Sequence, residues 1–366
     1  MSRQGDECVV ALCDQWLIAY GEEEWKNFCM DHVKSDKFSA YSQLSQQAFE
    51  DTLDWLKEWG CSRTTGLGTR IPWDKQFVIE SLSDSTIYMA YYTIVHLLQG
   101  GAINGNQEGP LGIKPSDLTK EVFDYIYLNK PYPQGCAIPE ESLAKMRYEF
   151  NYWYPMDLRC SGKDLIKNHL SFSLYNHAAI WEDKEKMPRS FFCNGHIMLD
   201  GKKMSKSDGN FLTLRDCIKE YGADATRIAL ADAGDTLDDA NFEKNTANSA
   251  ILKLFVLEEW MKNNLAKSVP EDFDWSSPDE FDDFDRIFEN EINYGQSITK
   301  TELTSMRFRF ALKYGFFQFL GLKEDYLISK TDENDIKKHT GVKPKLLLAY
   351  TEAQLIILNV FCPHFA

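Results

Sequence analysis

A short lysine-rich segment is the part of the sequence whose residue types most clearly indicate chemistry. The stretch DGKKMSKSDGNF, residues 200–211, holds three lysines and two serines within six residues, between Gly201 and Gly209. Lysine is a compact cation on a flexible stem that suits phosphate oxygens, and the two glycines favour a loop over a helix or strand. A solvated surface turn is the alternative explanation for a run of charge. The spacing G-x-x-x-x-G-K-[ST] of a phosphate-binding loop is absent from the segment.

A second segment, MDLRCSGKDLIKNHLSFSLYNHAAIW, changes its apolar period in the middle. Met156, Leu158 and Cys160 alternate as in a strand, which a Ser-Gly pair then interrupts. The apolar residues that follow recur with a helical period, and they are Ile166, Leu170, Leu174, Ala178 and Trp181. The pattern predicts a strand, a glycine turn and a helix. Gly162 and Asp164 would then lie at the carboxyl end of a strand, where open α/β sheets bind ligands.

The elements that flank the lysine segment would hold it in place. SFFCNGHIML predicts two strands joined by a turn at Asn194-Gly195, the second of which runs into the lysines. Thr213 with Asp216 resembles a capping box that opens a helix ending at Gly222. Asp224 would cap the helix that comes next.

The rest of the chain predicts an α/β part followed by a helical bundle. Val9–Leu12 looks like a short buried strand, and Phe49–Trp59 has the period of a helix. Beyond Phe242 the sequence turns to long amphipathic helices, in ILKLFVLEEWMKNNL, MRFRFALKYGFFQFL and KLLLAYTEAQLIILNVF. The acidic connector PEDFDWSSPDEFDDFD between the first two would be exposed and irregular.

Composition narrows the class of protein. The 366 residues suffice for two or three domains, and the net charge of −16 argues against nonspecific coating of nucleic acid, although a specific RNA partner stays possible. Nine cysteines without a C-x-x-C pair indicate reduced thiols in a cytosolic setting and no zinc site. The sequence contains no apolar run long enough to cross a bilayer, and its first residues are too polar for a signal peptide. A cytoplasmic location is therefore expected.

At the lysine segment the residues match a known family. Lys203–Ser207 is the unaltered K-M-S-K-S signature of the class I aminoacyl-tRNA synthetases, and it follows NGHIML as an approach strand does in that family. DWLKEWGCSRTTGLGTRIPW resembles the return from the inserted editing domain of the leucine, isoleucine and valine enzymes. ESLSDSTIYMAYYT, YPMDLRCSGKDLIKNHL and GADATRIALADAGDTLDDANF resemble the eukaryotic and archaeal leucyl-tRNA synthetases in particular.

The resemblance implies a fold and a division of the chain. Residues 1–235 would form the carboxyl half of a Rossmann-like parallel-sheet catalytic domain, α/β in class, that includes the K-M-S-K-S loop. Residues 236–366 would form an all-α bundle of the anticodon-binding type, truncated at its end. The implied activity is ATP-dependent activation of leucine and its transfer to tRNA-Leu. ATP would be a substrate accompanied by Mg²⁺, with no metal site on the protein itself.

The resemblance also implies roles for individual residues. Lys206 would stabilise the leaving pyrophosphate, with Lys203 assisting, and these two are the catalytic candidates. The residues implied to bind ATP or the adenylate are Gly162, Asp164, His169, His196, Ile197, Lys203, Lys206 and Ser207. Ser85 and Thr86 match a pair near the amino-acid pocket, although such a pair equally signals the start of a helix.

Within that set each residue has its own expected part. Gly162 would let the adenosine approach closely, and Asp164 would accept hydrogen bonds from the ribose hydroxyls. His196 and Ile197 would present backbone groups to the adenine edge. His169 would lie beside the adenylate, yet a histidine on an amphipathic helix is more often structural.

One family signature is absent from the sequence. None of the seven histidines has the H-x-G-H spacing that the family carries far upstream, before its editing domain. We therefore expect an incomplete piece of the enzyme, be it a gene-model fragment, a truncated product or half of a split enzyme that needs its amino-terminal half in trans. The alternatives are a non-catalytic tRNA- or protein-binding module of the same fold, and a helical scaffold with an accidental motif.

Overall fold

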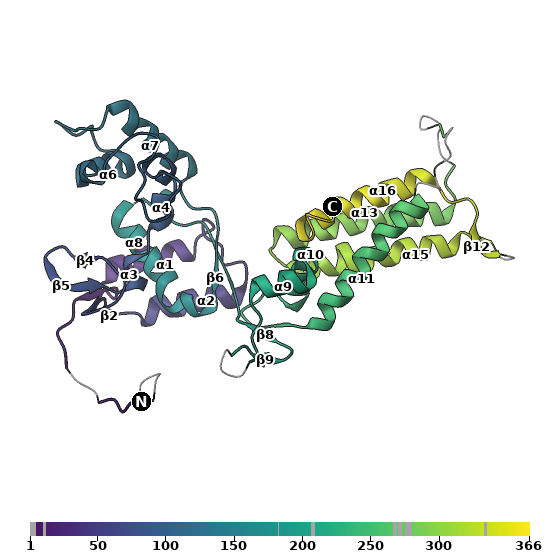
Figure 1. Ribbon diagram of the computed structural model, residues 1–366, viewed down its shortest axis with the longest axis horizontal. Helices are drawn as coiled ribbons and strands as arrows, with labels where there is room; N and C mark the ends of the chain where they lie inside the picture. The colour runs from purple at the N-terminus through teal and green to yellow at the C-terminus, as the bar shows by residue number, and fades with distance from the viewer. Residues whose placement is uncertain are drawn as a thin grey trace. The chain divides into compact units, whose positions relative to one another are not determined.

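A computed structural model describes residues 5–9, 12–181, 183–205, 209–265, 269, 273–274, 280–332 and 335–366. The chain divides into two compact units, Met1–Cys193 and Asn194–Ala366, and each is described by itself (Figure 1). Lys206 and Ser207, two of the residues implied by the resemblance, lie outside the described residues, as does half of the acidic connector. The prediction of an exposed and irregular connector is wrong at its end, because Asp282 caps a helix that begins at Asp283 and Asp285 is fully buried. No helix within the described ranges is long and apolar enough to cross a membrane.

The first unit begins with small antiparallel sheets. Strand β1, Leu17–Ala19, pairs with β2, Glu58–Gly60, so that Ile18 lies opposite Trp59. A second sheet has the order β3-β5-β4, and its strands are Ser62–Arg63, Asp74–Ile79 and Arg70–Ile71. The predicted buried strand at Val9–Leu12 is wrong, because Val9 and Leu12 are fully exposed and the first strand is β1. A four-residue apolar run does not make a core strand without a neighbouring strand to pair with, and none pairs with its described residues.

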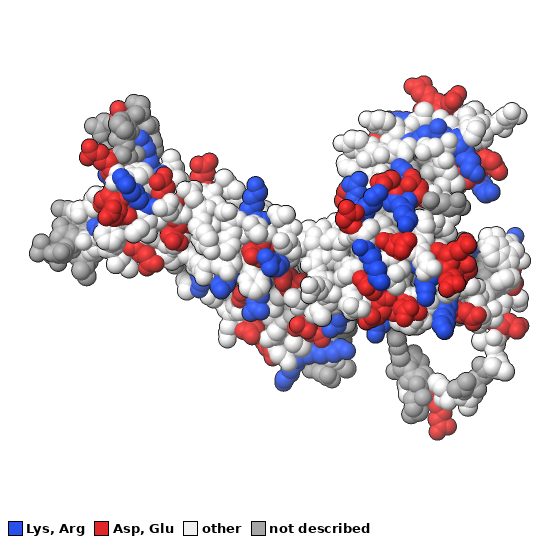
Figure 2. Space-filling model, turned by 180° about the vertical axis from the view of Figure 1, so that it is seen from behind, with Lys and Arg blue, Asp and Glu red and all other residues white. Residues whose placement is uncertain are grey.

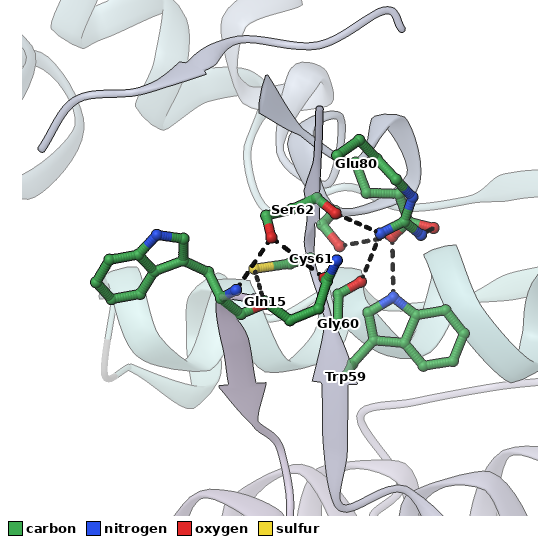
Figure 3. A network of polar contacts seen from close by, with 9 residues as sticks. Gln15, Trp59, Gly60, Cys61, Ser62 and Glu80 are labelled. Atoms are coloured by element: carbon green, nitrogen blue, oxygen red, sulfur yellow. Dashed lines mark hydrogen bonds and ion pairs between the residues drawn. The ribbon is translucent and has the colours of Figure 1, made fainter. Parts of the chain in front are cut away.

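Polar contacts to Glu80 and Gln15 fix the residues around Trp59. The Glu80 carboxylate accepts hydrogen bonds from Trp59 Nε1 at 2.9 Å, Arg63 Nη2 at 3.1 Å and Ser83 Oγ at 3.0 Å, the first two of them drawn in Figure 3. Ser62 Oγ in turn bonds to Gln15 across 47 residues of sequence. The Glu80 carboxylate thus ties residues 59–63 to the start of the next helix, a contact that the sequence pattern could not show.

Two helices pack with a third around an aromatic core. Helix α1, Glu23–Val33, and α2, Gln43–Trp55, both contact α8, Ser171–Trp181. The Tyr20 ring stacks on Phe172 with centroids 4.9 Å apart. The helix predicted at Phe49–Trp59 exists with other bounds, since Ser42 caps it earlier through Ser45 N–H and the chain becomes strand β2 from Glu58.

A helical subdomain, which the sequence analysis did not anticipate, fills residues 81–153. Its helices are α3, Ser81–Asp84; α4, Tyr88–Tyr92; α5, Val95–Leu98; η1, Pro115–Asp117; α6, Lys120–Leu128; and α7, Glu140–Trp153. Their core includes the fully buried Ile94, Ile126, Leu143 and Phe150. Helices α3 to α5 have only four or five residues each, so none is long enough to show the helical period of apolar residues by which a helix is predicted from sequence.

The predicted strand, turn and helix are confirmed in outline. Strand β6 spans Arg159–Gly162, three residues later than its predicted start, and lies beside β7, Phe191–Asn194. The chain then passes through a 3-10 turn, η2, Lys163–Leu165, and a π-helical turn, η3, Ile166–Leu170, into α8. Gly162 therefore lies at the carboxyl end of a strand, as predicted.

The second unit carries the lysine segment on a small mixed sheet of order β10-β8-β9. Strand β8, Ile197–Leu199, pairs in parallel with β10, Ala240–Phe242, and antiparallel with β9, Lys202–Lys203. Helices α9, Leu214–Tyr221, and α10, Ala223–Ala233, follow.

The caps of these two helices were largely predictable. Thr213 caps α9 by accepting from Asp216 N–H, and α9 ends at Gly222. The predicted cap at Asp224 is wrong, because Gly222 occupies the N-cap position of α10 and leaves Asp224 in its first turn. Gly222 has φ of +78°, which favours glycine at the junction where one helix ends and the next begins. Asp224 there still faces the positive end of the helix dipole.

A helical bundle completes this unit and confirms the predicted class of α/β with a bundle. Its elements are α11, Lys244–Trp260; η5, Met261–Leu265; α13, Asp283–Thr304; α14, Phe308–Leu312; η6, Lys313–Gln318; α15, Phe319–Ser329; β11, Thr331–Asp332; β12, Asp335–His339; and α16, Pro344–Phe361. A side chain at Gly315 would come within 2.9 Å of Thr299 and Ile357, so this glycine lets η6 pack closely against α13 and α16. The Lys330 ammonium pairs with Asp282 and with the fully buried Asp285, which ties the end of α15 to the start of α13.

Candidate functional site

The lysine segment lies on a tight hairpin whose stem is held by backbone contacts. Asp200 and Gly201 turn the chain with positive φ, and β9 returns along β8. Beyond β9, Ser205 N–H donates to Asn210 O at 2.9 Å and Asn210 Nδ2 donates to Lys203 O at 3.2 Å. Lys203 is exposed, so its ammonium is solvated on the described stem. Lys202 and Lys203, where a loop was predicted, form strand β9 because they pair with β8, whereas the tip with Lys206 lies outside the described residues.

Met204 anchors this stem to the interior of the unit. Its side chain is half-buried and packs against the hydrophobic core. It lines a cavity of about 230 Å³ together with Leu199, Leu212 and Phe242. Because side chains alternate along an extended chain, an inward Met204 leaves its neighbour Lys203 outward.

The turn before β8 is set by a close backbone crossing. A side chain on Gly195 would come 2.1 Å from Asp238 O, which only glycine avoids. His196 N–H donates to Asp239 Oδ1 at 2.9 Å, and His196 O accepts from Ala240 N–H at 2.9 Å. These bonds bring the start of β10 to the start of β8. That His196 and Ile197 meet an adenine stays a prediction.

Gly162 and Asp164 meet where β6 ends. A side chain on Gly162 would lie 2.7 Å from Asp164 Oδ1, so the glycine makes room for that carboxylate to fold back over the strand end. Asp164 is exposed, and its carbonyl accepts from Asn168 Nδ2 at 3.1 Å. The local geometry suits an exposed acceptor at a strand end, and the ribose contact stays a prediction.

A polar cluster forms around His169, which is only 4 % exposed. Arg159 Nη2 donates to His169 Nδ1 at 2.9 Å, so the proton of the neutral ring lies on Nε2. That Nε2 lies 3.0 Å from both Ser85 O and Ser85 Oγ, and the Ser85 hydroxyl donates to Ser81 O at 2.8 Å. Burial, reinforced by the charge of Arg159, lowers the pKa of His169 below its usual value. His169 is therefore a neutral ring with one fixed tautomer.

Two members of this cluster were not found by the sequence analysis. The Arg159 guanidinium lies 5.3 Å from the Tyr88 ring centroid, and the Tyr88 and His169 rings stack at 6.3 Å. Burial lowers the pKa of Arg159 from its usual value. The alternation that predicted Met156, Leu158 and Cys160 on one face puts Arg159 on the other, and this was the available signal.

Thr86 belongs to a neighbouring buried chain of polar groups. Its carbonyl accepts from Ser173 Oγ at 3.0 Å, and Ser173 O lies 2.6 Å from His177 Nδ1. His177 Nε2 bonds to the Tyr154 hydroxyl. Burial lowers the pKa of the fully buried His177 to about 4, so this ring is neutral at physiological pH.

The structure thus assembles the predicted residues in two groups. Those described in the first unit are Ser85, Thr86, Gly162, Asp164 and His169, and those in the second are His196, Ile197 and Lys203. Within the first unit, Ser85 and His169 are in direct contact, as are Gly162 and Asp164. Figure 2 shows acidic and basic side chains interspersed over one face of the molecule, with no broad field of one sign on it.

Comparison with known proteins decides the family. The family model described as tRNA synthetases class I (I, L, M and V) matches residues 4–243. The chain belongs to the class I tRNA synthetases. It is 47% identical to a cytoplasmic leucine--tRNA ligase of Pongo abelii and 44% identical to that of Saccharomyces cerevisiae, over its whole length in both cases. It spans 30% and 32% of the length of these two class I relatives.

Solved structures of the family share the fold. A Mycobacterium tuberculosis methionyl-tRNA synthetase bound by methionyl-adenylate has a TM-score of 0.60 at 16% identity, covering 95% of this chain and 61% of that one. An Agrobacterium radiobacter LeuRS-tRNA-LeuAMS complex has a TM-score of 0.51 at 16% identity, covering 83% of this chain and 35% of that one. The likeness confirms a class I synthetase fold for the chain.

Proposed function

We propose that the chain is part of a leucine--tRNA ligase, in which leucine attacks the α-phosphate of ATP and the leucyl group then passes to tRNA-Leu. The observation that carries this proposal is the identity of 44–47% to cytoplasmic leucine--tRNA ligases over the whole chain. The chain spans about a third of those relatives, so the activity is assigned to the protein of which such a segment is part. Because these relatives are named as cytoplasmic, we propose a cytoplasmic location for this protein as well.

In this proposal the K-M-S-K-S hairpin supplies cations to the phosphates. Charge moves onto pyrophosphate as it leaves, so a cation placed beforehand lowers the barrier. Lys203, exposed on a stem that Met204 anchors, is suited to this contact, and Lys206 and Ser207 complete the set. Asp164 would hold the ribose, with Gly162 giving the nucleoside close access.

The cluster around His169 would shape the amino-acid pocket. Ser85, His169, Arg159 and Tyr88 are fixed by mutual contacts before any substrate arrives. A neutral histidine there cannot serve as a proton donor at physiological pH, so its part is to position its neighbours. Thr86 contributes through its backbone carbonyl.

Mg²⁺ would arrive with ATP. No group of three or more histidine, cysteine or carboxylate side chains in the described ranges could hold a metal ion. Mg²⁺ commonly keeps most of its waters and binds nucleotide phosphates. We therefore assign no protein ligand set to it, and residues 1–235 and 236–366 remain our proposed catalytic and tRNA-binding portions.

A chimeric enzyme tests the proposal. The matching segment of the Saccharomyces cerevisiae relative, 44% identical, is replaced by this chain, and leucine-dependent exchange of pyrophosphate into ATP is measured. We expect exchange with leucine and none with isoleucine or valine. A correctly folded chimera that binds tRNA but supports no exchange would favour the alternative of a non-catalytic binding module.

The isolated chain provides the complementary measurement. Its 366 residues contain no H-x-G-H, so the reactants lack an opposing half that aligns them, and positioning contributes about 7–11 kcal/mol to such a step. We expect no exchange from the chain alone and recovery when a segment carrying H-x-G-H is supplied in trans. Robust exchange by the isolated chain would show that another group replaces that motif.

A further inference from the structure

A cavity of about 650 Å³ lies within the first unit, apart from the residues proposed to act on leucine and ATP. Three segments line it: α4 and α5, the carboxyl end of α7, and the residues that lead into β6. The volume is typical of a small-molecule site, which usually measures about 300–1,000 Å³.

The walls of the cavity are aromatic and unusually exposed. Tyr92 is 63 % and Trp153 is 59 % exposed, although both side chains are large and apolar enough to be buried in a core. Met89 and Met156 also contribute to the lining. Exposed aromatic faces around a hollow indicate a surface that another molecule covers.

The titratable side chains of the lining, apart from its tyrosines, are two carboxylates and the exposed His96. Glu149 and Asp157 are lining carboxylates, and none of the residues lining the cavity is a lysine or arginine. Glu149 accepts from Trp153 Nε1 at 3.1 Å, which fixes the carboxylate beside the indole. Asp157 pairs with the exposed Arg189 at 2.7 Å, a surface ion pair that water screens. A carboxylate has two oxygens and about four acceptor positions, so each can accept further donors.

We propose that this cavity binds an organic cation, a guanidinium or an alkylammonium, against Tyr92 and Trp153 with Glu149 and Asp157 as its counter-charges. Aromatic faces attract such cations through the ring quadrupole, and the carboxylates add hydrogen-bond acceptors of the complementary charge. A phosphate or carboxylate ligand would face the like charge of Glu149, and Arg189 already pairs with Asp157, the other lining carboxylate.

An unpaired nucleobase is the competing occupant, since bases also stack on aromatic side chains. Its phosphates would meet the same carboxylates, so the lining favours the cation. The two occupants differ in charge, which makes them separable by experiment.

The test compares two ligands of nearly the same shape and different charge. Butylguanidine is a cation and butylurea is neutral, and their binding to the whole chain is followed by calorimetry and by the indole N–H resonance of Trp153. We expect saturable binding of butylguanidine, with butylurea weaker by about tenfold, the effect of one ion pair or cation–π contact. Butylurea or AMP binding as tightly as butylguanidine would overturn the proposal.

Variants locate the site. Glu149→Gln keeps the shape and removes the charge, and should weaken butylguanidine binding by about tenfold while leaving butylurea unchanged. Glu141→Gln and Tyr148→Leu, at exposed positions of the same helix that do not line the cavity, are the matched controls and should leave binding unchanged. Equal binding by Glu149→Gln and the parent chain would overturn the proposal whether or not the chimera is active.

The source of the cation is distinguished by two further ligands. Agmatine represents a free small cation, and N-acetyl-Gly-Arg-Gly-amide represents an arginine in a polypeptide. Tighter binding of agmatine assigns the site to a small molecule, and tighter binding of the peptide assigns it to a protein segment. Failure of both to compete with butylguanidine would overturn the proposal.

Discussion

The cluster around His169 and the hairpin that carries Lys203 are built in opposite ways. In the cluster, burial and hydrogen bonds to two residues, Arg159 and Ser85, hold a neutral ring in one tautomer. In the hairpin, backbone bonds, the Asn210 side-chain amide and one apolar anchor hold the stem, and the cation is left in water. Histidine and lysine both count as candidate catalytic residues in a sequence. The comparison teaches that burial keeps the histidine neutral, whereas exposure leaves the ammonium of the lysine in water.

The largest effect expected from this contrast concerns the hairpin. In the chimeric enzyme, Lys206→Ala should lower the rate of leucine-dependent pyrophosphate exchange by about 10²–10³, as for the loss of one preorganised transition-state contact. The apparent affinity for leucine should change little, because the lysine acts on the phosphates. Steady-state exchange measured against leucine and ATP separates the two. Exchange as fast as that of the parent chimera would contradict the proposal that Lys206 stabilises the leaving pyrophosphate.

The second prediction concerns acid and the first unit. The pKa of His177 is about 4 in the fold against an ordinary value near 6.5, so the unfolded chain takes up a proton first as the pH falls. Above pH 6.5 the ring is neutral in both states and does not change the stability. Between pH 6.5 and 4 only the unfolded chain is protonated, so the free energy of unfolding falls progressively, by about 3 kcal/mol. Urea unfolding at several pH values, compared between the parent and His177→Gln, measures it.

The same acid dependence should be missing from the second unit. Its histidines with described side chains, His196 and His364, are exposed. A probe in the second unit, such as the fluorescence of Trp260, should report no fall in the free energy of unfolding that a buried histidine would cause. Equal slopes in the parent and in His177→Gln would show that the ring is not buried as described.

A third prediction concerns RNA and the exposed cations of the bundle. Arg309 and Lys313 are exposed on α14 and η6, whereas the nearby Arg307 is paired with Glu302. We expect weak tRNA binding that falls by tens of fold between 50 and 200 mM salt, as for about three phosphate contacts. Arg309→Ala with Lys313→Ala should flatten the salt dependence, and Lys219→Ala on α9 is the control. Binding that is insensitive to salt would exclude phosphate contacts there.

The smallest effect concerns the anchor of the hairpin. Met204→Gln places a polar amide against the apolar cavity of about 230 Å³ and should destabilise the stem by about 1–2 kcal/mol. Met204→Leu, similar in volume, should be close to neutral. Hydrogen exchange of residues 202–205 and 209–212 measures the stem directly. Unchanged protection in Met204→Gln would mean that backbone bonds alone hold it.

Local patterns predicted much of this molecule. The strand that enters the lysine segment, the Thr213 cap, the end of α9 at Gly222 and the strand that ends at Gly162 all follow from residues within a few positions of one another. The errors were also local, because Val9–Leu12 has the apolar pattern of a strand but no partner, and Gly222 displaced Asp224 as a cap. The family itself followed from five consecutive residues and their approach strand, and the comparisons bear it out.

By itself the sequence determined which residues could do chemistry, namely the lysines of the hairpin and Gly162 with Asp164, since glycine, charge and period act over short distances. Only the tertiary structure decided what surrounds them. Arg159 meets His169 across ten residues, Ser85 meets it across 84, and the acidic aromatic cavity draws on three separate segments. A contact between distant residues depends on how whole helices and strands pack, and burial then sets the charge of the histidine, which no local pattern encodes.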